Sequence, residues 1–173
     1  MTLVIHGKSG ERKTSRACQL VSDLRQRGYT VGGIVAHGLR SEGLRSGFDL
    51  EELLSGNRVP LARAGQVSPV RIGRFGFSRE GIAFGREALA LPRLRRADLI
   101  VIDEVGPWEL EGNGWSRELD RLSALPVPMV MTVRTSLVDE VTRRWGKRDA
   151  AVFAAQGVTS QQILDALQTQ YPA

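Results

Sequence analysis

The sequence predicts an α/β fold in which helices flank a mostly parallel β-sheet. Strand-like and helix-like segments alternate along all 173 residues, and residues 99–102 form an unbroken apolar run. Such alternation is typical of parallel sheets, because each crossover helix returns the chain to the same end of the sheet. The apolar run is typical of a central strand covered on both faces. We expect five core strands within one domain over residues 1–173, since the length fits one domain and no long Ser-, Gly- or Pro-rich linker interrupts the chain.

The first elements follow from apolar periodicity. Residues 2–5 are apolar and rich in branched side chains, which favours a buried strand. Residues 13–27 carry apolar side chains at the helical spacing i, i+3, i+4 and i+7, and Gly28 is a natural C-terminal cap. Residues 29–36 form the second expected strand, and residues 38–47 form a polar connection that contains glycines.

The rest of the chain gives shorter signals. Residues 48–96 hold short apolar pieces interrupted by glycines and a proline, which predicts a small β-rich insertion and then a broken helix. The apolar strand at residues 99–102 follows. Beyond it we expect helices and strands to alternate as helix 115–124, strand 127–133, helix 137–145, strand 151–154 and helix 160–170.

The segment between the first strand and the first helix has the pattern of a phosphate-binding loop. Residues 7–14 match G-x-x-x-x-G-K-[ST] at every fixed position except the last glycine, which is Arg12. In such a loop, backbone N–H groups face the phosphates and the following helix adds the positive end of its dipole. Lys13 would reach the β- and γ-phosphates, and the Thr14 hydroxyl would bind Mg²⁺. The predicted phosphate-binding residues are Gly7, Lys8, Ser9, Gly10, Glu11, Arg12, Lys13, Thr14 and Ser15.

Arg12 leaves two possibilities open. Its guanidinium could add a phosphate contact, or it could occupy the phosphate site and leave a weak, slow or empty nucleotide pocket. A simple Gly-rich turn with a basic helix start is the alternative to a phosphate loop. The position between a strand and an amphipathic helix favours the phosphate loop, and so do Lys8 and Lys13, which are two of only three lysines. The segment also loosely resembles a variant loop whose extra lysine acts across dimer interfaces, but Ser9 and Arg12 depart from that motif.

Asp103 and Glu104 end the apolar run and predict the second half of a hydrolytic site. In α/β folds, ligands bind at the carboxyl ends of the strands, where this pair lies. Asp103 and Thr14 are the expected Mg²⁺ ligands. Glu104, as general base for an attacking water, and Lys13 are the expected catalytic residues. A solvated turn is the alternative, but the pair follows the most hydrophobic strand in the chain.

Residues 97–110 read Ala-Asp-Leu-Ile-Val-Ile-Asp-Glu-Val-Gly-Pro-Trp-Glu-Leu and resemble the signature of a P-loop nucleoside-triphosphatase family, that of the thermophilic NTPases and the human cancer-related nucleoside-triphosphatase. The resemblance covers most of residues 2–135. It implies a RecA-like core and Mg²⁺-dependent hydrolysis of ATP, GTP and other NTPs to NDP and phosphate, with broad base tolerance. Shorter matches occur in order at residues 31–33, 45–49, 72–75 and 128–133.

Three positions depart from the pattern of that family. Arg12 replaces the loop glycine, and Arg134 stands where the family usually has His. Gln161 and Gln162 replace an Asn-Arg pair that commonly follows the final Val-Thr. The resemblance therefore does not transfer base recognition to this chain, and the preferred base stays undetermined. Arg134 could sense a γ-phosphate or lie on the surface.

The net charge of +5, from 24 basic and 19 acidic residues, indicates an anionic partner. Residues 71–96 hold seven arginines and two glutamates, a surplus of 7 − 2 = +5. This segment could contact nucleic acid through phosphates, with Phe75 and Phe77 as stacking rings. We favour a solvated surface whose phenylalanines lie in the core. The clustering of the scarce lysines in the loop points to nucleotide phosphate instead.

Location and function complete the predictions. Cys18 is the only cysteine, and the apolar start is too short for a signal peptide or a membrane span, so we expect a cytoplasmic protein. The leading hypothesis is an NTPase. The second is a nucleotide-binding or nucleic-acid-associated protein whose hydrolysis is weakened or lost through Arg12. The third is a small-molecule kinase, ranked lower because Glu104 better suits a water nucleophile and no lid-like insertion is evident. The oligomeric state is undetermined.

Overall fold

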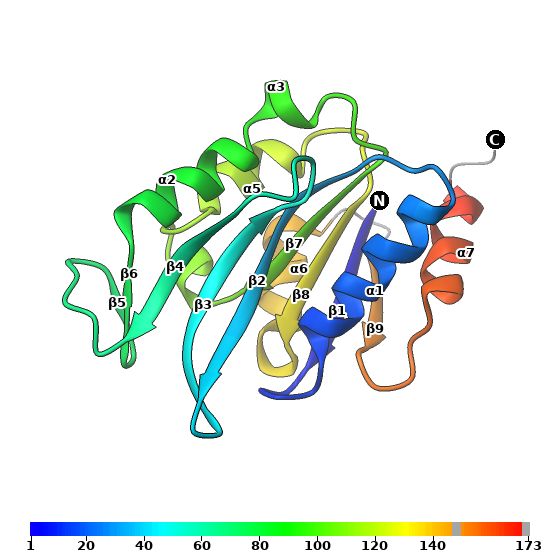
Figure 1. Cartoon of the computed structure of the whole chain (residues 1–173). Coiled ribbons are helices and arrows are strands. Elements are labelled where there is room, and N and C mark those ends of the chain that lie inside the picture. Colours follow the sequence, from blue (N-terminus) through cyan, green and yellow to red (C-terminus); the bar gives the residue numbers. More distant parts are fainter. Residues whose placement is uncertain (147–149, 171–173) are drawn as a thin grey trace.

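The computed structural model describes residues 1–146 and 150–170, and the strands in these residues form one sheet of nine (Figure 1). The order across the sheet is β5-β6-β4-β3-β2-β7-β8-β1-β9. Five adjacent strands run parallel to one another, which confirms the predicted core. These are β2 (Val31–Ser41), β7 (Leu99–Val105), β8 (Met129–Arg134), β1 (Thr2–Gly7) and β9 (Ala151–Ala154).

Helices cover both faces of this parallel core, as Figure 1 shows. On one face of β7, Leu99 and Val101 pack in a hydrophobic cluster with α1 and α7. On the opposite face, Ile100 and Ile102 pack in a second hydrophobic cluster. The central apolar run is therefore buried on both sides, as predicted. None of the helices in the described residues is long and apolar enough to cross a membrane. One face carries α1 (Lys13–Gln26) and α7 (Ser160–Gln170), and the other α2 (Arg79–Ala88), α5 (Ser116–Leu122) and α6 (Val138–Trp145).

The predicted β-rich insertion extends the sheet with antiparallel strands and is followed by the predicted broken helix, α2 and then α3 (Leu91–Leu94). One prediction here is wrong: residues 38–47 are a β-hairpin and not a polar connection. Its turn residues Glu42 and Gly43 have φ values of +50° and +78°, which suits a two-residue hairpin turn. Glu-Gly is a weaker turn signal than Asn-Gly. The added strands are β3 (Leu44–Glu52), β4 (Arg58–Ala64), β5 (Arg71–Ile72) and β6 (Phe75–Phe77).

Gly33 allows β2 to approach β7 closely. Its φ is +110°, and a Cβ atom there would lie 1.9 Å from the Val101 carbonyl oxygen. No other residue type fits both conditions. This close pairing brings the end of β2 next to the acidic end of β7.

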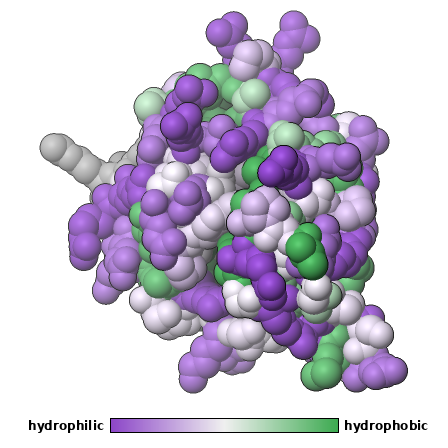
Figure 2. All heavy atoms as spheres, turned by 90° about the vertical axis from the view of Figure 1, so that its left-hand side faces the viewer, coloured by the Kyte–Doolittle hydropathy of each residue, from purple (hydrophilic) through white to green (hydrophobic). Residues whose placement is uncertain are grey.

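The arginine-rich segment lies on the surface, where it starts at the β5–β6 end of the molecule and continues through α2 to α3. Figure 2 shows that hydrophilic side chains cover most of this end. Arg93 forms an ion pair with Glu52, in which the Nη2 atom of Arg93 lies 2.6 Å from a carboxylate oxygen of Glu52. Phe75 and Phe77 are half-buried and pack against the core, in agreement with the favoured prediction. The exposed arginines of the segment are Arg71, Arg74, Arg79, Arg86, Arg93, Arg95 and Arg96.

The buried carboxylate of Glu109 caps the start of α4 (Pro107–Leu110), a single helical turn that the sequence did not predict. Glu109 is 3% exposed, and its Oε2 atom accepts a hydrogen bond of 3.0 Å from the Gly106 N–H. Burial raises the pKa of Glu109 from 4.5 to about 7, hydrogen bonds from the backbone oppose the rise, and the Glu104 carboxylate adds a smaller increase.

This shift predicts a pH-dependent cost of folding. Because the folded pKa lies above the unfolded value, the free energy of unfolding falls as pH rises from about 4.5 to about 7 and is level above that range. The loss is about 3 kcal/mol at about 1.4 kcal/mol per pKa unit. Urea unfolding measures the free energy of unfolding at acidic and at mildly alkaline pH. Between these two conditions, wild type should lose about 3 kcal/mol more than Glu109→Gln. The exposed Glu111→Gln variant is the matched control, and parallel pH curves for wild type and Glu109→Gln would contradict the prediction.

Candidate functional site

The segment after β1 is a tight loop that ends at the first turn of α1. The Lys8 N–H donates to Glu11 Oε2 at 2.6 Å, and Gly10 has a φ of +86°. The Lys13 side chain is 4% exposed and donates from Nζ to the Lys8 carbonyl at 3.2 Å. The lysine therefore folds back over the loop, and its ammonium group lies where a phosphate bound by the loop would need a positive charge.

Arg12 occupies the N-cap of α1 in the left-handed conformation, with φ 57° and ψ 23°. This conformation costs a residue with a Cβ atom roughly 1–2 kcal/mol, whereas glycine adopts it freely. Backbone geometry therefore favours the glycine of the consensus pattern at this position, and this chain adopts the same conformation with Arg12. The Arg12 side chain is exposed and provides no side-chain cap for the helix.

A β-bulge at the end of β7 brings Asp103 and Glu104 to the same site. Ile102 pairs with Met131 and Val105 pairs with Val133, so β7 has one residue more than β8 between these pairs. Glu104 lies in the bulge and has a positive φ of +60°. In a regular strand the two carboxylates would point to opposite faces. The bulge instead lets both line one cavity.

Asp103 is buried and holds hydrogen bonds from three different elements. Its Oδ2 atom accepts from the Thr14 hydroxyl at 2.9 Å and from the Ala36 N–H at 3.2 Å. Its Oδ1 atom accepts from the Thr132 hydroxyl. Burial raises the pKa of Asp103 to about 6, the neighbouring Glu104 carboxylate adds to the rise, and the three hydrogen bonds oppose it.

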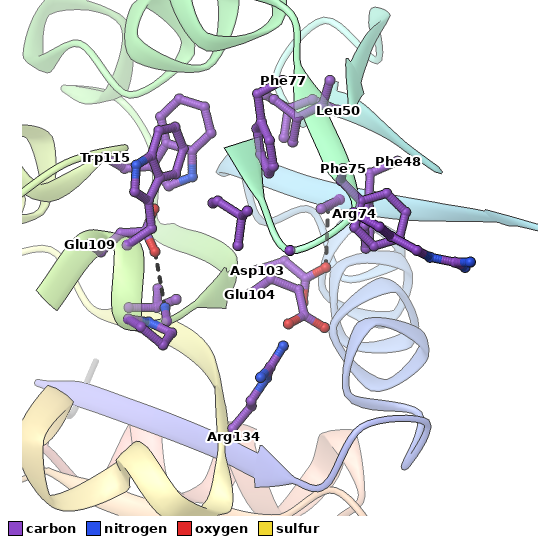
Figure 3. Close-up of a pocket in the computed structure, with 18 residues that line it drawn as sticks. Phe48, Leu50, Arg74, Phe75, Phe77, Asp103, Glu104, Glu109, Trp115 and Arg134 are labelled. Atoms are coloured by element: carbon purple, nitrogen blue, oxygen red, sulfur yellow. Dashed lines mark hydrogen bonds between the residues drawn. The ribbon is translucent and has the colours of Figure 1, made fainter. Parts of the chain in front are cut away.

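Glu104 lies beside Asp103 and reaches the loop lysine. One carboxylate oxygen is 4.0 Å from Lys13 Nζ, and the side chain is 38% exposed. Its N–H donates to the Thr132 hydroxyl at 2.8 Å. Figure 3 shows that the Glu104 carboxylate and the Arg134 guanidinium point toward one another. Arg134 is the last residue of β8 and pairs in register with Gly7, the first residue of the phosphate loop.

Two contributors to the site escaped the sequence analysis. Thr132 is fully buried and holds both Asp103 and the Glu104 backbone. A single hydroxyl within the apolar run of β8 is the signal that could have identified it. The N–H of Ala36 carries no side-chain signal at all, because a backbone group donates whatever the residue type.

A hollow of about 620 Å³ lies along the loop, and we call it the phosphate hollow. Loop residues form one wall, and Glu104 closes one end. Arg40 and Arg45 enter the opposite wall from the β2–β3 hairpin. The positive charge of this lining suits a polyphosphate. Of the predicted set 7–15, the residues that line the hollow are Gly10, Arg12, Lys13, Thr14 and Ser15, whereas Gly7, Lys8, Ser9 and Glu11 do not line it.

The oxygen atoms of Thr14 and Asp103 are suited to hold Mg²⁺. The hydroxyl and the carboxylate lie 2.9 Å apart at the end of the phosphate loop. Magnesium prefers oxygen donors and takes one or two protein ligands together with substrate phosphates and waters. Within residues 1–146 and 150–170 there is no group of three or more His, Cys, Asp or Glu side chains that could hold a metal. The donor set therefore fits a metal that is bound together with a nucleotide.

Gln161 and Gln162, which replace the Asn-Arg pair, bond to residues at the start of α7, and Gln161 also accepts from Arg27 Nη2 at the end of α1 at 2.8 Å. The Gln162 side chain accepts from the Thr159 N–H at 2.9 Å, and the Thr159 hydroxyl accepts from the Gln162 N–H at 3.2 Å. This reciprocal pair caps the start of α7. Gln161 donates to Asp165 one turn further along.

Comparison with known proteins identifies the family of this chain. A family model described as NTPase matches residues 2–166. The nucleoside-triphosphatase THEP1 of Pyrococcus abyssi is 38% identical over 141 residues, which are 80% of this chain and 77% of that protein. The THEP1 of Methanothermobacter thermautotrophicus is 33% identical over 157 residues, 88% of this chain and 86% of that protein.

Two solved structures share the fold. The solution structure of a human cancer-related nucleoside triphosphatase has a TM-score of 0.66 and 26% identity, and the match covers 99% of this chain and 96% of that chain. The crystal structure of THEP1 from Aquifex aeolicus has a TM-score of 0.70 and 24% identity, and the match covers 97% and 99%. The predicted P-loop α/β fold is therefore confirmed, and this chain belongs to the NTPase family that the THEP1 nucleoside-triphosphatases represent.

Proposed function

We propose that this protein is a Mg²⁺-dependent nucleoside-triphosphatase that hydrolyses the β–γ bond of NTPs to give NDP and phosphate. The observation that carries the proposal is the hydrogen-bonded set in which Thr14, Asp103 and Thr132 join the phosphate loop to the carboxyl end of the sheet. The names of the THEP1 relatives support the same activity. The chain would act as one catalytic domain over residues 1–173.

The loop residues bind and orient the triphosphate. Backbone N–H groups of residues 7–15 and the N-terminal end of α1 would face the phosphates, with the Lys8 and Glu11 N–H groups released from Glu11 Oε2 and the Lys8 carbonyl when the triphosphate binds. Lys13 leaves its contact with the Lys8 carbonyl and places its ammonium group against the β- and γ-phosphates. Arg40 and Arg45 hold additional negative charge from the hairpin side of the phosphate hollow.

Thr14 and Asp103 would hold Mg²⁺ together with phosphate oxygens. When bound, the ion would neutralise charge on the β- and γ-phosphates. Asp103 must be ionised for this role, and the hydrogen bonds from Thr14, Thr132 and the Ala36 N–H favour its charged form against burial.

Glu104 orients the attacking water and takes its proton. Its carboxylate lies next to Lys13 and is partly exposed, so a water can reach it from solvent. Thr132 positions Glu104 by accepting its N–H and fixes Asp103 through the same hydroxyl. Arg134 faces Glu104 and would meet the charge that develops on the transferred phosphoryl group.

Broad base tolerance belongs to the same proposal. Gln161 and Gln162, which replace the Asn-Arg pair of the family, are engaged by Arg27, Thr159 and Asp165, and the contacts proposed here for the substrate are all to its phosphates. The single cysteine, Cys18, is consistent with a cytoplasmic enzyme.

Replacement of the two catalytic side chains tests the assignment. Glu104→Gln should lower kcat for phosphate release roughly 10²- to 10⁴-fold with little change in NTP affinity, because only proton transfer is lost. Lys13→Ala should weaken NTP binding and lower kcat, because a charge that faces the phosphates in both states is removed. Phosphate release from several NTPs with Mg²⁺ and direct nucleotide titration measure the two effects. The exposed Glu80→Gln variant on α2 is the control, and normal hydrolysis by Glu104→Gln would refute its role as base.

Arg12 decides between the proposal and its alternative, a nucleotide-binding protein with weak or lost hydrolysis. We expect wild type to hydrolyse NTPs and Arg12→Gly to be more stable than Arg12→Ala by about 1 kcal/mol, because only glycine relieves the left-handed backbone. Both variants lose the guanidinium, so a difference in activity between them reports on the backbone alone. Phosphate release by Arg12→Gly together with none by wild type would favour the alternative function.

Thr132 can be tested by a matched pair of variants. Thr132→Val should lower the free energy of unfolding by roughly 1–3 kcal/mol, because it leaves Asp103 and the Glu104 N–H without their shared hydroxyl. It should also reduce kcat more than it changes KM, since the loop contacts to NTP remain. Thr132→Ser keeps the hydroxyl and should recover most of kcat. Unchanged kcat in Thr132→Val together with a loss in Thr132→Ser would show that the methyl packing, and not the hydroxyl, matters.

A further inference from the structure

A second cavity, of about 420 Å³, opens beside the catalytic carboxylates on the side away from the phosphate loop, and we call it the apolar pocket. Its walls come from the antiparallel insertion and from the segment that follows β7 (Figure 3). Five aromatic side chains are among the lining residues: the Phe48 and Phe75 ring centroids are 5.3 Å apart, the Phe77 and Trp108 centroids are 5.2 Å apart, and Trp115 is the fifth. A cavity of this size with such a lining is typical of a small-molecule site.

Arg74 lines the apolar pocket beside Phe75, with its guanidinium carbon 5.2 Å from the ring centroid. Three further charged groups lie where the pocket meets the catalytic site. Asp103, Glu104 and Arg134 line that end. Asp103 already accepts three hydrogen bonds, whereas Glu104 is 38% exposed. Glu104 also lines the phosphate hollow, so one carboxylate borders both cavities.

This arrangement defines the chemistry of the occupant. The aromatic wall accepts a flat apolar body through stacking and burial. The buried Glu109 carboxylate in the wall already accepts the Gly106 N–H and offers little to a ligand. A hydroxyl on the ligand would meet Glu104 at the position from which a water would attack the γ-phosphate.

We propose that the apolar pocket binds aromatic alcohols as phosphoryl acceptors, so that the protein transfers the γ-phosphoryl group to an alcohol as well as to water. The alcohol oxygen forms a bond to the γ-phosphorus, the bond from that phosphorus to the β–γ bridging oxygen breaks, and Glu104 takes the hydroxyl proton. The products are a phosphate monoester and NDP, with no oxidant or reductant required. The inference rests on the proposed NTPase function, because it uses the same NTP, Lys13 and Glu104.

The balance of products separates the two reactions. Hydrolysis releases NDP and inorganic phosphate in equal amounts, whereas transfer gives NDP in excess of phosphate by the amount of ester formed. We would incubate the full-length protein with γ-labelled ATP, Mg²⁺ and benzyl alcohol or naphthylmethanol, and quantify NDP, phosphate and ester. Glycerol at the same concentration is the polar control. We expect ester and excess NDP with the aromatic alcohols and far less with glycerol.

A pair of variants ties the reaction to the apolar pocket. Ile72 lies at its rim and is 39% exposed, so Ile72→Trp should obstruct the entrance. Val67 is 95% exposed on the neighbouring connection and does not line the pocket, which makes Val67→Trp the matched control. Ile72→Trp should lose ester formation roughly tenfold or more while keeping phosphate release in water, because burial of one ring contributes at least a factor of ten in binding. Val67→Trp should behave as wild type.

Each other outcome has a definite meaning. Equal NDP and phosphate in the presence of aromatic alcohols would overturn the acceptor role and leave the NTPase proposal intact. Equal ester from glycerol, or full ester formation by Ile72→Trp, would overturn the assignment to the apolar pocket. Absence of NDP under all conditions would overturn the NTPase proposal and the transfer reaction with it.

Discussion

The site depends on one buried carboxylate and the groups that keep it ionisable inside the sheet. Asp103 is enclosed between β2, β8 and the first turn of α1, each of which supplies one hydrogen bond. Burying a carboxylate without such partners would cost several kcal/mol. Any shift in strand register or in the position of α1 would remove a donor. The carboxylate therefore links the phosphate loop, the central strand and the two strands beside it into one arrangement, and the positions of Thr14 and Glu104 follow from it.

Rigid surroundings also sustain unfavourable backbone conformations at the site. Arg12 and Glu104 both have positive φ values, and both line the phosphate hollow. Such conformations persist where the surrounding structure determines them, and they are common at functional sites. At Glu104 the bulge places two adjacent carboxylates on one cavity, which a regular strand cannot do. Arg12 adopts a left-handed conformation at the start of α1 without being glycine. A strained arginine therefore stands where the phosphate-loop pattern has glycine.

The position of Glu104 between two cavities gives the insertion a chemical role. The phosphate hollow is charged and lined by the loop and the hairpin, whereas the apolar pocket is walled by aromatic rings of the insertion and of the segment after β7. A carboxylate that borders both can take a proton from a nucleophile that approaches from either. Water and an alcohol would then compete for one phosphoryl group, and the choice would depend on occupancy of the apolar pocket rather than on a different catalytic residue.

The sequence alone determined the parallel core, the phosphate loop and the acidic pair, because each depends on local order along the chain: apolar runs, helical spacing and a fixed motif. Lys13, Thr14, Asp103 and Glu104 were all predicted as site residues in this way, and the structure places their side chains together. Thr132, the Ala36 N–H, the hairpin arginines and the apolar pocket were decided only by the tertiary structure. These features arise from strand register and from a bulge, which join residues as far apart as Thr14 and Asp103, 89 positions along the chain. Pairing over such distances depends on packing of the whole sheet, and no local pattern encodes it.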